Sequence, residues 1–269
     1  MSLPIVSDDV FAEVVSALRT AGCVFAEDEA ALLLAAAPDS LSLVGMVERR
    51  CSGLPLEHVL GWAEFCGLRL AVAPGVFVPR RRTEFLVHEA VALVHGSAAP
   101  GPTVVVDLCC GSGAVGAVLG SMLSDVELHA ADIDPDAVRC AAGNLAPVGG
   151  TVHRGDLYAA LPRHLLGRVD VLVANAPYVP TEEIGLLPSE ARDHEPLVAL
   201  DGGRDGLAIH RRVAEQAPAW LAPGGRLLVE TSEHQAPGTA EAFGRSGLCV
   251  EIAVCAELYA TVVVGTMPA

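Results

Sequence analysis

Residues 103–116 read TVVVDLCCGSGAVG, a run of apolar residues that passes directly into a glycine-rich turn. The β-branched residues predict a buried strand over 103–107, and residues 113–123 have the composition of a helix that packs behind it. The turn at 111–116 matches the spacing Gly-x-Gly-x-x-Gly, in which glycines let a ligand approach the backbone at a helix N-terminus. The pattern therefore predicts a strand, a ligand-binding turn and a helix.

The same alternation of strands and helices continues toward the C-terminus. Further strands are predicted at 126–132, 151–154, 169–174, before Glu230, near Cys249–Ala253 and at Thr261–Val264. Alternating strands and helices predict an α/β fold with a doubly wound, mostly parallel sheet, and the terminal pair of strands gives it an antiparallel edge. A long loop is expected from Asn175 to about Asp205.

The N-terminal third has a different rhythm. Residues 8–53 show the apolar period of short helices, and residues 61–78 alternate like a hairpin broken by glycines. Residues 83–95 are again helical, and residues 96–102 are a linker of small residues and proline. The chain therefore divides into a small helical part and a larger α/β part.

Composition excludes several classes of protein. The 269 residues are 52% hydrophobic and 19% charged, which excludes an intrinsically disordered chain. The basic residues are 17 Arg without Lys, set against 33 acidic residues, and the net charge of −16 gives no general attraction for nucleic acid. The basic run Arg80-Arg81-Arg82 is taken as solvated surface.

Cysteine, histidine and apolar patterns point to a cytoplasmic protein without a metal. The eight cysteines are scattered and are expected to be reduced thiols, and the nine histidines show no pairing with them at metal-ligand spacing. Residues 1–8 lack the pattern of an export signal, and the longest apolar run, 30–37, is too short to cross a bilayer.

Three carboxylates are predicted to surround the glycine turn. Asp132 ends the strand that follows, where a carboxylate accepts hydrogen bonds from ribose hydroxyl groups. This suits either a dinucleotide or S-adenosylmethionine, because both carry a ribose. Asp107 would repel a pyrophosphate but attract the charged amino end of S-adenosylmethionine, and Asp156 follows the third strand, where it can meet an adenine amino group. Together they favour the methyl donor.

The tetrapeptide Asn175-Ala176-Pro177-Tyr178 stands at the end of the fourth predicted strand. Ligands of open α/β sheets bind outside the carboxyl ends of the strands, so the tetrapeptide should line the same crevice. It resembles the Asn-Pro-Pro-Tyr motif of methyltransferases that act on planar amide or aromatic amino nitrogens. The resemblance implies that the Asn175 oxygen and the Ala176 carbonyl accept both N–H bonds of a target NH₂, while Tyr178 packs on its face. Two such acceptors hold a weakly nucleophilic nitrogen in line with the methyl group.

Most of the chain is similar to one subfamily, the HemK-type protein N(5)-glutamine methyltransferases. Its members carry a Gly-x-x-x-Phe-x-Gly-Leu hairpin, a Pro-Gly-Val-x-x-Pro-Arg stretch and a Thr-Glu pair before the catalytic motif. After that motif they carry Glu-Pro, Ala-Leu and Gly-Gly-x-Asp-Gly-Leu. In this chain the corresponding segments are 61–68, 74–80, 83–84, 195–196, 199–200 and 202–207.

This resemblance implies a seven-stranded Rossmann-like methyltransferase domain over 77–269 and a helical substrate-recognition domain with a hairpin linker over 1–76. It implies methyl transfer from S-adenosylmethionine to the glutamine of the Gly-Gly-Gln motif of a peptide-chain release factor. The expected enzyme is a cytoplasmic monomer whose partner is that protein, without nucleic acid or membrane. The candidate cofactor contacts are Asp107, Cys109, Gly111, Gly113, Asp132, Ile133, Asp156, Leu157 and Asn175, and the candidate catalytic residues are Asn175, Ala176, Pro177 and Tyr178.

The departures from the subfamily leave alternatives open. Ala176 stands where the motif has its first Pro, so a fixed φ is lost and an N–H is gained, but Pro177 still favours extended geometry and activity is expected to survive. Arg81 and Arg82 replace Pro and Glu, and His210 replaces a common Tyr. The alternatives are an amino-methyltransferase of DNA or RNA bases, a protein methyltransferase with another target, a member that binds cofactor without turnover, and a nicotinamide-dependent oxidoreductase.

Overall fold

The computed structural model describes residues 8–95 and 101–269. The expectation about the N-terminal segment, except its residue 8, and most of the predicted 96–102 linker lie outside the described residues. Among the described residues, no helix combines the length and the apolar character needed to cross a bilayer.

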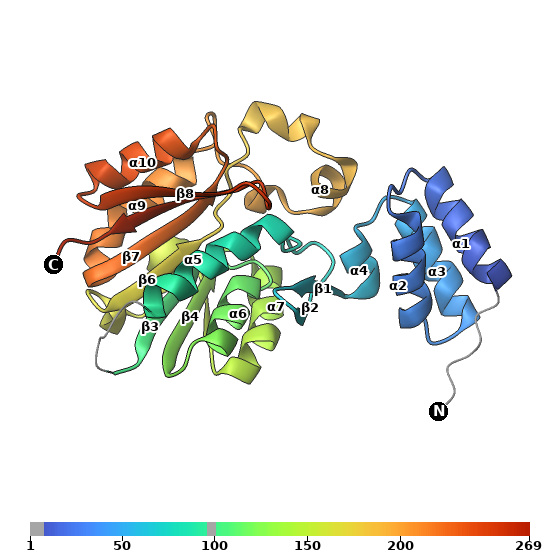
Figure 1. Cartoon of the computed structure of the whole chain (residues 1–269), viewed down its shortest axis with the longest axis horizontal. Coiled ribbons are helices and arrows are strands. Elements are labelled where there is room, and N and C mark those ends of the chain that lie inside the picture. The colour runs from blue at the N-terminus through green and yellow to red at the C-terminus, as the bar shows by residue number, and fades with distance from the viewer. Residues whose placement is uncertain (1–7, 96–100) are drawn as a thin grey trace.

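The larger part of the chain is built on one sheet (Figure 1). Its strands are β3 (Thr103–Leu108), β4 (Val126–Asp132), β5 (Thr151–Arg154), β6 (Val169–Ala174), β7 (Leu221–Thr231), β8 (Cys249–Cys255) and β9 (Ala260–Thr266). They lie in the order β5-β4-β3-β6-β7-β9-β8. The first five run parallel, and β9 runs antiparallel to both β7 and β8. The predicted doubly wound, mostly parallel seven-stranded sheet is confirmed.

Each face of the sheet is covered by its own layer of helices, as Figure 1 shows. The alternation along β3 sends Val105 toward one core and Val104 and Val106 toward the other. One layer holds α5 (Glu84–His95), α6 (Ala114–Met122) and α7 (Pro135–Leu145), and the other holds α9 (Ala208–Trp220) and α10 (Ala236–Arg245). Because the strand order reverses between β3 and β6, a crevice opens at the carboxyl ends of these two strands.

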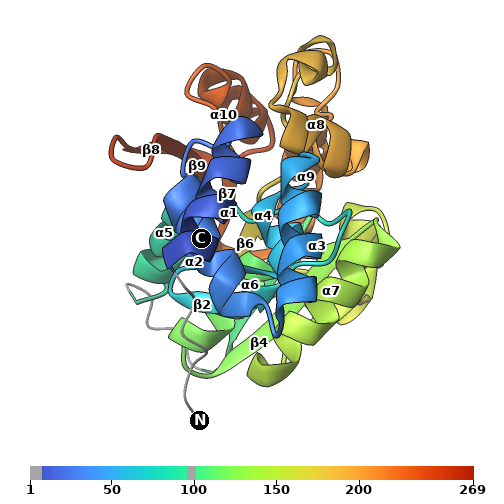
Figure 2. The same cartoon turned by 90° about the vertical axis from the view of Figure 1, so that its right-hand side faces the viewer.

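The N-terminal helices form a separate apolar cluster. They are α1 (Asp8–Thr20), α2 (Ala26–Ala36), α3 (Ser40–Cys51) and α4 (Leu56–Leu60). Figure 1 shows the first three gathered at one end of the molecule, and in Figure 2 that end faces the viewer. Leu18 and Leu33 are fully buried among them. The hairpin of β1 (Trp62–Phe65) and β2 (Leu68–Ala71) follows, and its strands end earlier than the predicted limit at residue 78.

Several short helices differ from the sequence-based prediction, which had a loop over 175–205 and no helix after residue 53 until residue 83. Five of them begin directly after a proline that is the N-cap residue, with φ between −51° and −70° and an extended ψ of 135–143°. They are α4 after Pro55, η4 (Arg163–Leu165) after Pro162, η5 (Thr181–Leu186) after Pro180, α8 (Ser189–His194) after Pro188 and η6 (Leu197–Ala199) after Pro196. The remaining short ones are η1 (Arg81–Thr83), η2 (Ala146–Val148) and η3 (Leu157–Ala160).

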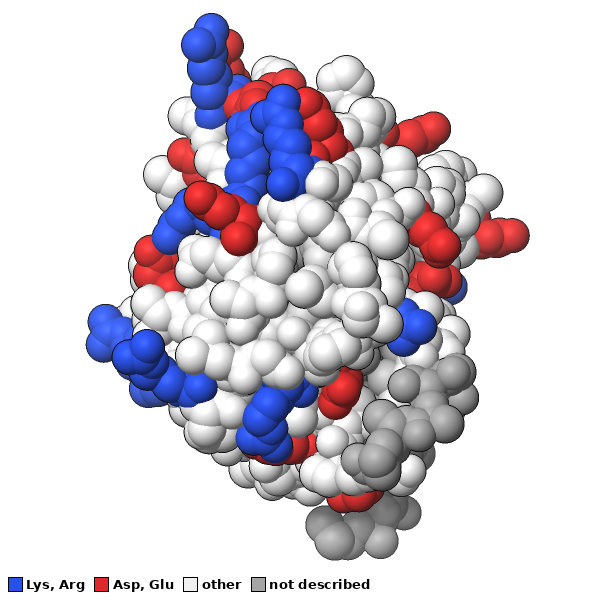
Figure 3. Space-filling model, turned by 90° about the vertical axis from the view of Figure 1, so that its left-hand side faces the viewer, with Lys and Arg blue, Asp and Glu red and all other residues white. Residues whose placement is uncertain are grey.

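Charge is distributed unevenly over the surface. On the face shown in Figure 3, arginine side chains lie beside acidic ones around a broad uncharged centre. Among the described residues on this face the arginines form no continuous track of the kind that follows a phosphate backbone.

Candidate active site

A cavity of about 680 Å³ lies at the carboxyl ends of the parallel strands, within the size range of small-molecule sites. It brings together residues from the turns after β3, β4, β5 and β6, as the strand pattern predicted. The predicted site residues that line it are Asp107, Cys109, Gly111, Asp132, Ile133, Asp156, Leu157, Asn175, Ala176, Pro177 and Tyr178. Gly113 is the one predicted residue that is not among the lining residues.

The turn after β3 is built from left-handed backbone. Cys109, Gly111 and Gly113 have φ values of 55°, 55° and 76°. Such a conformation is costly for a side chain like that of Cys109, and strained residues of this kind concentrate at functional sites. Gly113 serves packing, because a Cβ there would lie 2.4 Å from Leu145 Cδ1 on α7.

Asp107 lies at the bottom of the crevice with almost no access to solvent. Its Oδ2 accepts a hydrogen bond from the Gly116 backbone N–H at 2.9 Å, at the start of α6. Burial raises the pKa of the Asp107 carboxyl to about 7, and the nearby Asp132 charge acts in the same direction. The site therefore holds a carboxylate that a bound cation would stabilise.

Asp132 ends β4 and organises the backbone around it. Its two carboxylate oxygens accept hydrogen bonds from the N–H groups of Gly111 and Asp134, each at 2.9 Å. Burial raises the pKa of Asp132, although these hydrogen bonds oppose the rise. Ile133 follows with half of its side chain exposed toward the crevice. The Asp132 carboxylate suits ribose hydroxyl groups as hydrogen-bond donors. The negative charges of Asp107 and Asp132 oppose the binding of a pyrophosphate.

The turn after β5 supplies a third acidic residue. Gly155 and Leu157 take φ values of 158° and 47°, which turn the chain sharply at the rim of the cavity. Asp156 between them is half exposed, and its Oδ2 lies 2.6 Å from Arg212 Nη2 on α9. The carboxylate is thus held in place by Arg212, and its other oxygen has no hydrogen bond within the described residues.

The Asn175 side chain is oriented by a neighbour that sequence reasoning did not single out. Asn175 Nδ2 donates a hydrogen bond to Thr83 Oγ1 at 3.1 Å. Because the amide nitrogen is engaged in this way, Oδ1 is the group left to accept hydrogen bonds from a ligand in the cavity. Thr83 belongs to the Thr-Glu pair of the resemblance, so a signal for it was present in the sequence.

Tyr178 is held at both its hydroxyl and its backbone. Its hydroxyl group donates to Glu230 Oε1 at 3.3 Å, and its carbonyl accepts a hydrogen bond from Gln235 Nε2 at 2.8 Å. Arg82 Nε also lies 3.3 Å from Glu230 Oε1. Burial raises the pKa of Glu230, whereas Thr83 and Arg82 lower it. Glu230 therefore interacts with Tyr178, with Arg82 and with Thr83, the residue that orients Asn175. No motif in the sequence pointed to Glu230.

His210 lies beneath the tetrapeptide 175–178. Its ring is fully buried, 6.2 Å from the Tyr178 ring, and its Nδ1 lies 2.9 Å from Thr239 Oγ1. Burial lowers the pKa of His210 to about 4, while the Ala176 backbone opposes the shift. Two of the departures from the subfamily motif, Ala176 and His210, are therefore neighbours in space.

A buried ion pair connects the segment over the cavity to the chain before α5. Glu195 Oε1 accepts the Val78 N–H at 3.0 Å, and Glu195 Oε2 lies 2.5 Å from Arg80 Nη2. Nearby, the Arg50 Nη1 of α3 lies 2.7 Å from Glu190 Oε1, and Glu190 lines the cavity. The first contact ties the wall of the cavity to the chain before α5, and the second ties it to the N-terminal helices.

The comparisons with known proteins agree with this geometry. The family model for the methyltransferase small domain matches residues 72–186. A release factor glutamine methyltransferase from Geobacter sulfurreducens is 38% identical over 207 residues, which cover 76% of this chain and 70% of that protein. A 4-amino-L-phenylalanine/4-methylamino-L-phenylalanine methyltransferase from Streptomyces pristinaespiralis is 36% identical over 205 residues, 75% of this chain and 69% of that protein.

A solved structure supports the fold. A methyltransferase from Pyrococcus furiosus superposes with a TM-score of 0.55 at 15% identity, over 76% of this chain and 91% of that one. With relatives of this identity and coverage, the protein is an S-adenosylmethionine-dependent methyltransferase with a Rossmann-like sheet. More narrowly, the chain belongs to the release factor glutamine methyltransferase family. The methyltransferase prediction is confirmed, and membership contradicts the nicotinamide-dependent alternative.

Proposed function

We propose that this protein transfers a methyl group from S-adenosylmethionine to the side-chain amide nitrogen of a glutamine in a peptide-chain release factor, within its Gly-Gly-Gln motif. The observation that carries the proposal is the Asn175 amide, whose nitrogen is engaged by Thr83 while its oxygen stays available in the acidic crevice. The names of the relatives supply the substrate.

In the proposed complex the tetrapeptide clamps the target amide. Asn175 Oδ1 and the Ala176 carbonyl accept its two N–H bonds, and the Tyr178 ring covers its planar face. An amide nitrogen is a weak nucleophile because its lone pair is delocalised. Two fixed acceptors orient that nitrogen and stabilise the positive charge that develops on it during transfer, which is how such a site lowers the barrier.

The crevice residues fit S-adenosylmethionine by charge and by position. Asp132 would hold the ribose hydroxyl groups, Asp107 would compensate the positive amino end, and Asp156 would face the adenine amino group. Cys109, Gly111, Ile133 and Leu157 would shape the walls. When bound, S-adenosylmethionine supplies an electrophilic methyl carbon on a sulfonium sulfur. The protein's part is to exclude water and to align the amide nitrogen with that carbon.

The N-terminal part is proposed to bind the release factor. Residues 1–76 would form the substrate-recognition domain with its hairpin linker, and residues 77–269 the catalytic domain. The ion pair between Arg50 and Glu190 supports this division of labour, because it connects α3 to the cavity wall. The proposal places the enzyme in the cytoplasm, where release factors act, and has it work as a monomer.

A second candidate substrate is an aromatic amine on a free amino acid. The relative from Streptomyces pristinaespiralis that is named for 4-amino-L-phenylalanine supports it. An aniline NH₂ is planar and carries two N–H bonds, so the same two acceptors and the same tyrosine ring suit it. In this case Arg82, which lines the cavity, would meet the carboxylate of the amino acid.

The experiment compares two acceptors with labelled methyl donor. We expect label on a recombinant release factor and none on its variant with Ala in place of the Gly-Gly-Gln glutamine. The protein Asn175→Ala should bind S-adenosylmethionine in calorimetry but transfer no label. Label on 4-aminophenylalanine but not on phenylalanine, with an unlabelled release factor, would replace the first substrate by the second. Cofactor binding without label on either acceptor would contradict both.

A further inference from the structure

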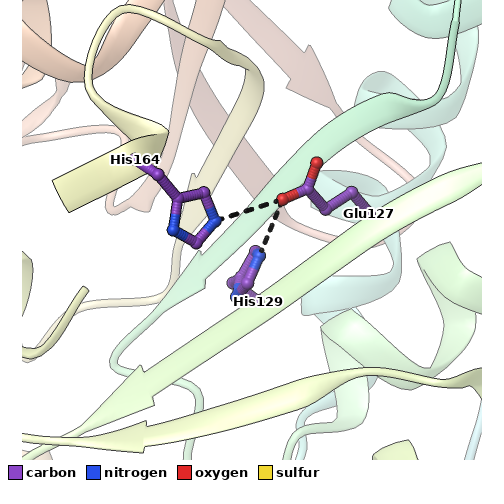
Figure 4. Close-up of side chains that lie close together, drawn as sticks. All are labelled: Glu127, His129 and His164. Carbon is purple, nitrogen blue, oxygen red and sulfur yellow. Dashed lines mark hydrogen bonds and ion pairs between the residues drawn. The ribbon is translucent and has the colours of Figure 1, made fainter. Parts of the chain in front are cut away.

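A group of three side chains of the types that ligate metal ions lies outside the active site, at the amino end of β4. Glu127 and His129 point to the same side of this strand, and His164 reaches them from η4 (Figure 4). Glu127 Oε1 is 3.3 Å from His129 Nε2 and 3.4 Å from His164 Nε2. The three ligand atoms all lie within 4.8 Å of one another.

The spacing of these atoms fits a metal centre as well as it fits the hydrogen bond between His129 Nε2 and Glu127 Oε1. An N–H···O hydrogen bond is normally about 2.7–3.2 Å long, so both contacts are long for that interaction. Zinc binds His nitrogen and carboxylate oxygen at about 2.0–2.1 Å in a tetrahedron, whose ligand atoms are then about 3.3–3.4 Å apart. Two edges of the cluster match this value.

The surroundings orient the ligands. His129 Nδ1 lies 3.0 Å from His153 Nε2, and the two rings stack with centroids 5.2 Å apart. A metal-bound histidine commonly uses its second nitrogen in such a hydrogen bond. Arg168 Nη2 donates a hydrogen bond to Glu127 Oε2 at 3.0 Å, so Oε1 is the oxygen that faces the histidines. His164 is more than half exposed, so the remaining coordination position is open to water.

We propose that Glu127, His129 and His164 bind a divalent transition-metal ion of the Zn²⁺ type, with water as the fourth ligand. Two nitrogens and one oxygen are the ligand set that Zn²⁺ and Co²⁺ accept, whereas Mg²⁺ and Ca²⁺ prefer oxygen alone. Asp132 of the active site is five residues beyond Glu127 and three beyond His129 on β4, so its Cα lies about 10 Å from that of the nearer ligand at 3.3 Å per residue. The ion therefore fastens η4 to β4 and does not take part in methyl transfer.

The test is a titration of the whole chain with Co²⁺, followed by displacement with Zn²⁺. We expect one ion per chain, with the visible absorption of four-coordinate Co²⁺ and without a thiolate-to-cobalt charge-transfer band. His164→Ala and Glu127→Gln should each weaken binding by about tenfold or more. His88→Ala, which removes an exposed histidine on α5, should bind like the wild type. Because His164 is largely exposed, its truncation should leave metal-free thermal unfolding unchanged.

Two results would overturn the proposal. The first is binding that does not saturate below about millimolar Co²⁺, or binding of equal strength in wild type, His164→Ala and Glu127→Gln. The second is a thiolate charge-transfer band, which would assign the ion to the cysteines.

Discussion

Asp107 illustrates how one residue links stability to ligand binding. Its carboxylate is buried beside a second carboxylate, and its pKa is raised to about 7. In the free protein the ionised form is therefore costly, whereas a cationic ligand removes the cost. A site of this kind gives up stability of the free protein in order to bind a positive group.

The first prediction concerns the pH dependence of cofactor binding. Above pH 7 Asp107 is ionised and attracts a positive ligand, and below pH 7 it takes up a proton. The affinity for S-adenosylmethionine should therefore rise with pH across this region and should be nearly flat in Asp107→Asn, which should also bind about tenfold more weakly at pH 8. Calorimetry at several pH values checks this. Equal affinities in both proteins would contradict the proposed role of Asp107.

The second prediction concerns His210 and acid stability. Its pKa is about 4 in the folded protein and 6.5 in the unfolded chain, so the unfolded chain takes up the proton first. The stabilisation is complete above pH 6.5 and is lost as the pH falls toward 4, by up to about 3 kcal/mol. Urea unfolding between these pH values should show that the free energy of unfolding falls less in His210→Gln than in wild type.

Asp107 acts in the opposite sense over an overlapping range. Because its folded pKa is raised, its destabilising effect grows from pH 3.8 to about 7, and Asp107→Asn should stabilise the free protein at pH 8 but not at pH 4. In the wild type the effects of His210 and Asp107 on the free energy of unfolding partly cancel. Each effect is therefore measured as the difference between wild type and the variant of that residue. If the free energy of unfolding of His210→Gln depended on pH in the same way as that of wild type, the histidine would not titrate as described.

The third prediction tests the orientation of Asn175. Thr83→Val removes the hydroxyl group that engages Asn175 Nδ2, so the amide can rotate and present nitrogen to the substrate. We expect kcat to fall by about 10- to 100-fold with unchanged cofactor affinity, because the change affects only the clamp. Thr83→Ser keeps the hydroxyl group and should retain most of the activity. Similar losses in both variants would argue against orientation by Thr83.

At the scale of elements, the turn after β3 depends on how closely α6 and α7 approach each other. Gly113 is the N-cap residue of α6, with φ 76°, and α7 packs directly against it. The glycine pattern in the sequence predicts a ligand turn, and the structure adds a packing role for one of the glycines. Gly111 lines the cavity, whereas Gly113 faces the helix.

The fourth prediction follows from that separation. Gly113→Ala places a methyl group 2.4 Å from Leu145 Cδ1 in a left-handed conformation, and it should destabilise the protein by about 2–4 kcal/mol. Gly143→Ala is the matched control, since Gly143 is an exposed residue of α7 with nothing within 4 Å of the added carbon. It should stabilise the protein by about 0.5–1 kcal/mol. Denaturant unfolding of the two variants measures the difference, and equal effects would contradict the packing role.

At the scale of the whole molecule, the cavity depends on contacts between parts that are far apart in sequence. Glu195 joins the segment over the cavity to Val78 and Arg80, and Arg50 joins Glu190 to the N-terminal helices. The wall of the active site is thus held by contacts with the chain before α5 and with α3.

The fifth prediction is that the Glu195 contacts keep this wall closed. Glu195→Ala leaves the Val78 N–H and Arg80 without their carboxylate, which should cost about 3 kcal/mol and raise the KM for S-adenosylmethionine. Glu182→Ala in the same segment changes an exposed glutamate and should have little effect on either quantity. Unfolding and steady-state kinetics of the two variants check this. A normal KM in Glu195→Ala would mean that the wall closes without it.

The parts that could be predicted from the sequence are those with local signals. The valines of β3, the glycines after it and the tetrapeptide after β6 each predict their position within a few residues. The short helices after prolines were missed because a proline that ends one element can also begin the next. Glu230 was missed for another reason. It lies 52 residues from Tyr178 in sequence, and only the folded sheet brings the two side chains together.

The most direct test of the central claim is to locate the methyl group by mass spectrometry on a release factor that has been incubated with the enzyme and S-adenosylmethionine. The account predicts methylation on the side-chain nitrogen of the Gly-Gly-Gln glutamine, and none with Asn175→Ala. A methyl group on any other residue of the release factor, or equal modification by Asn175→Ala, would contradict it.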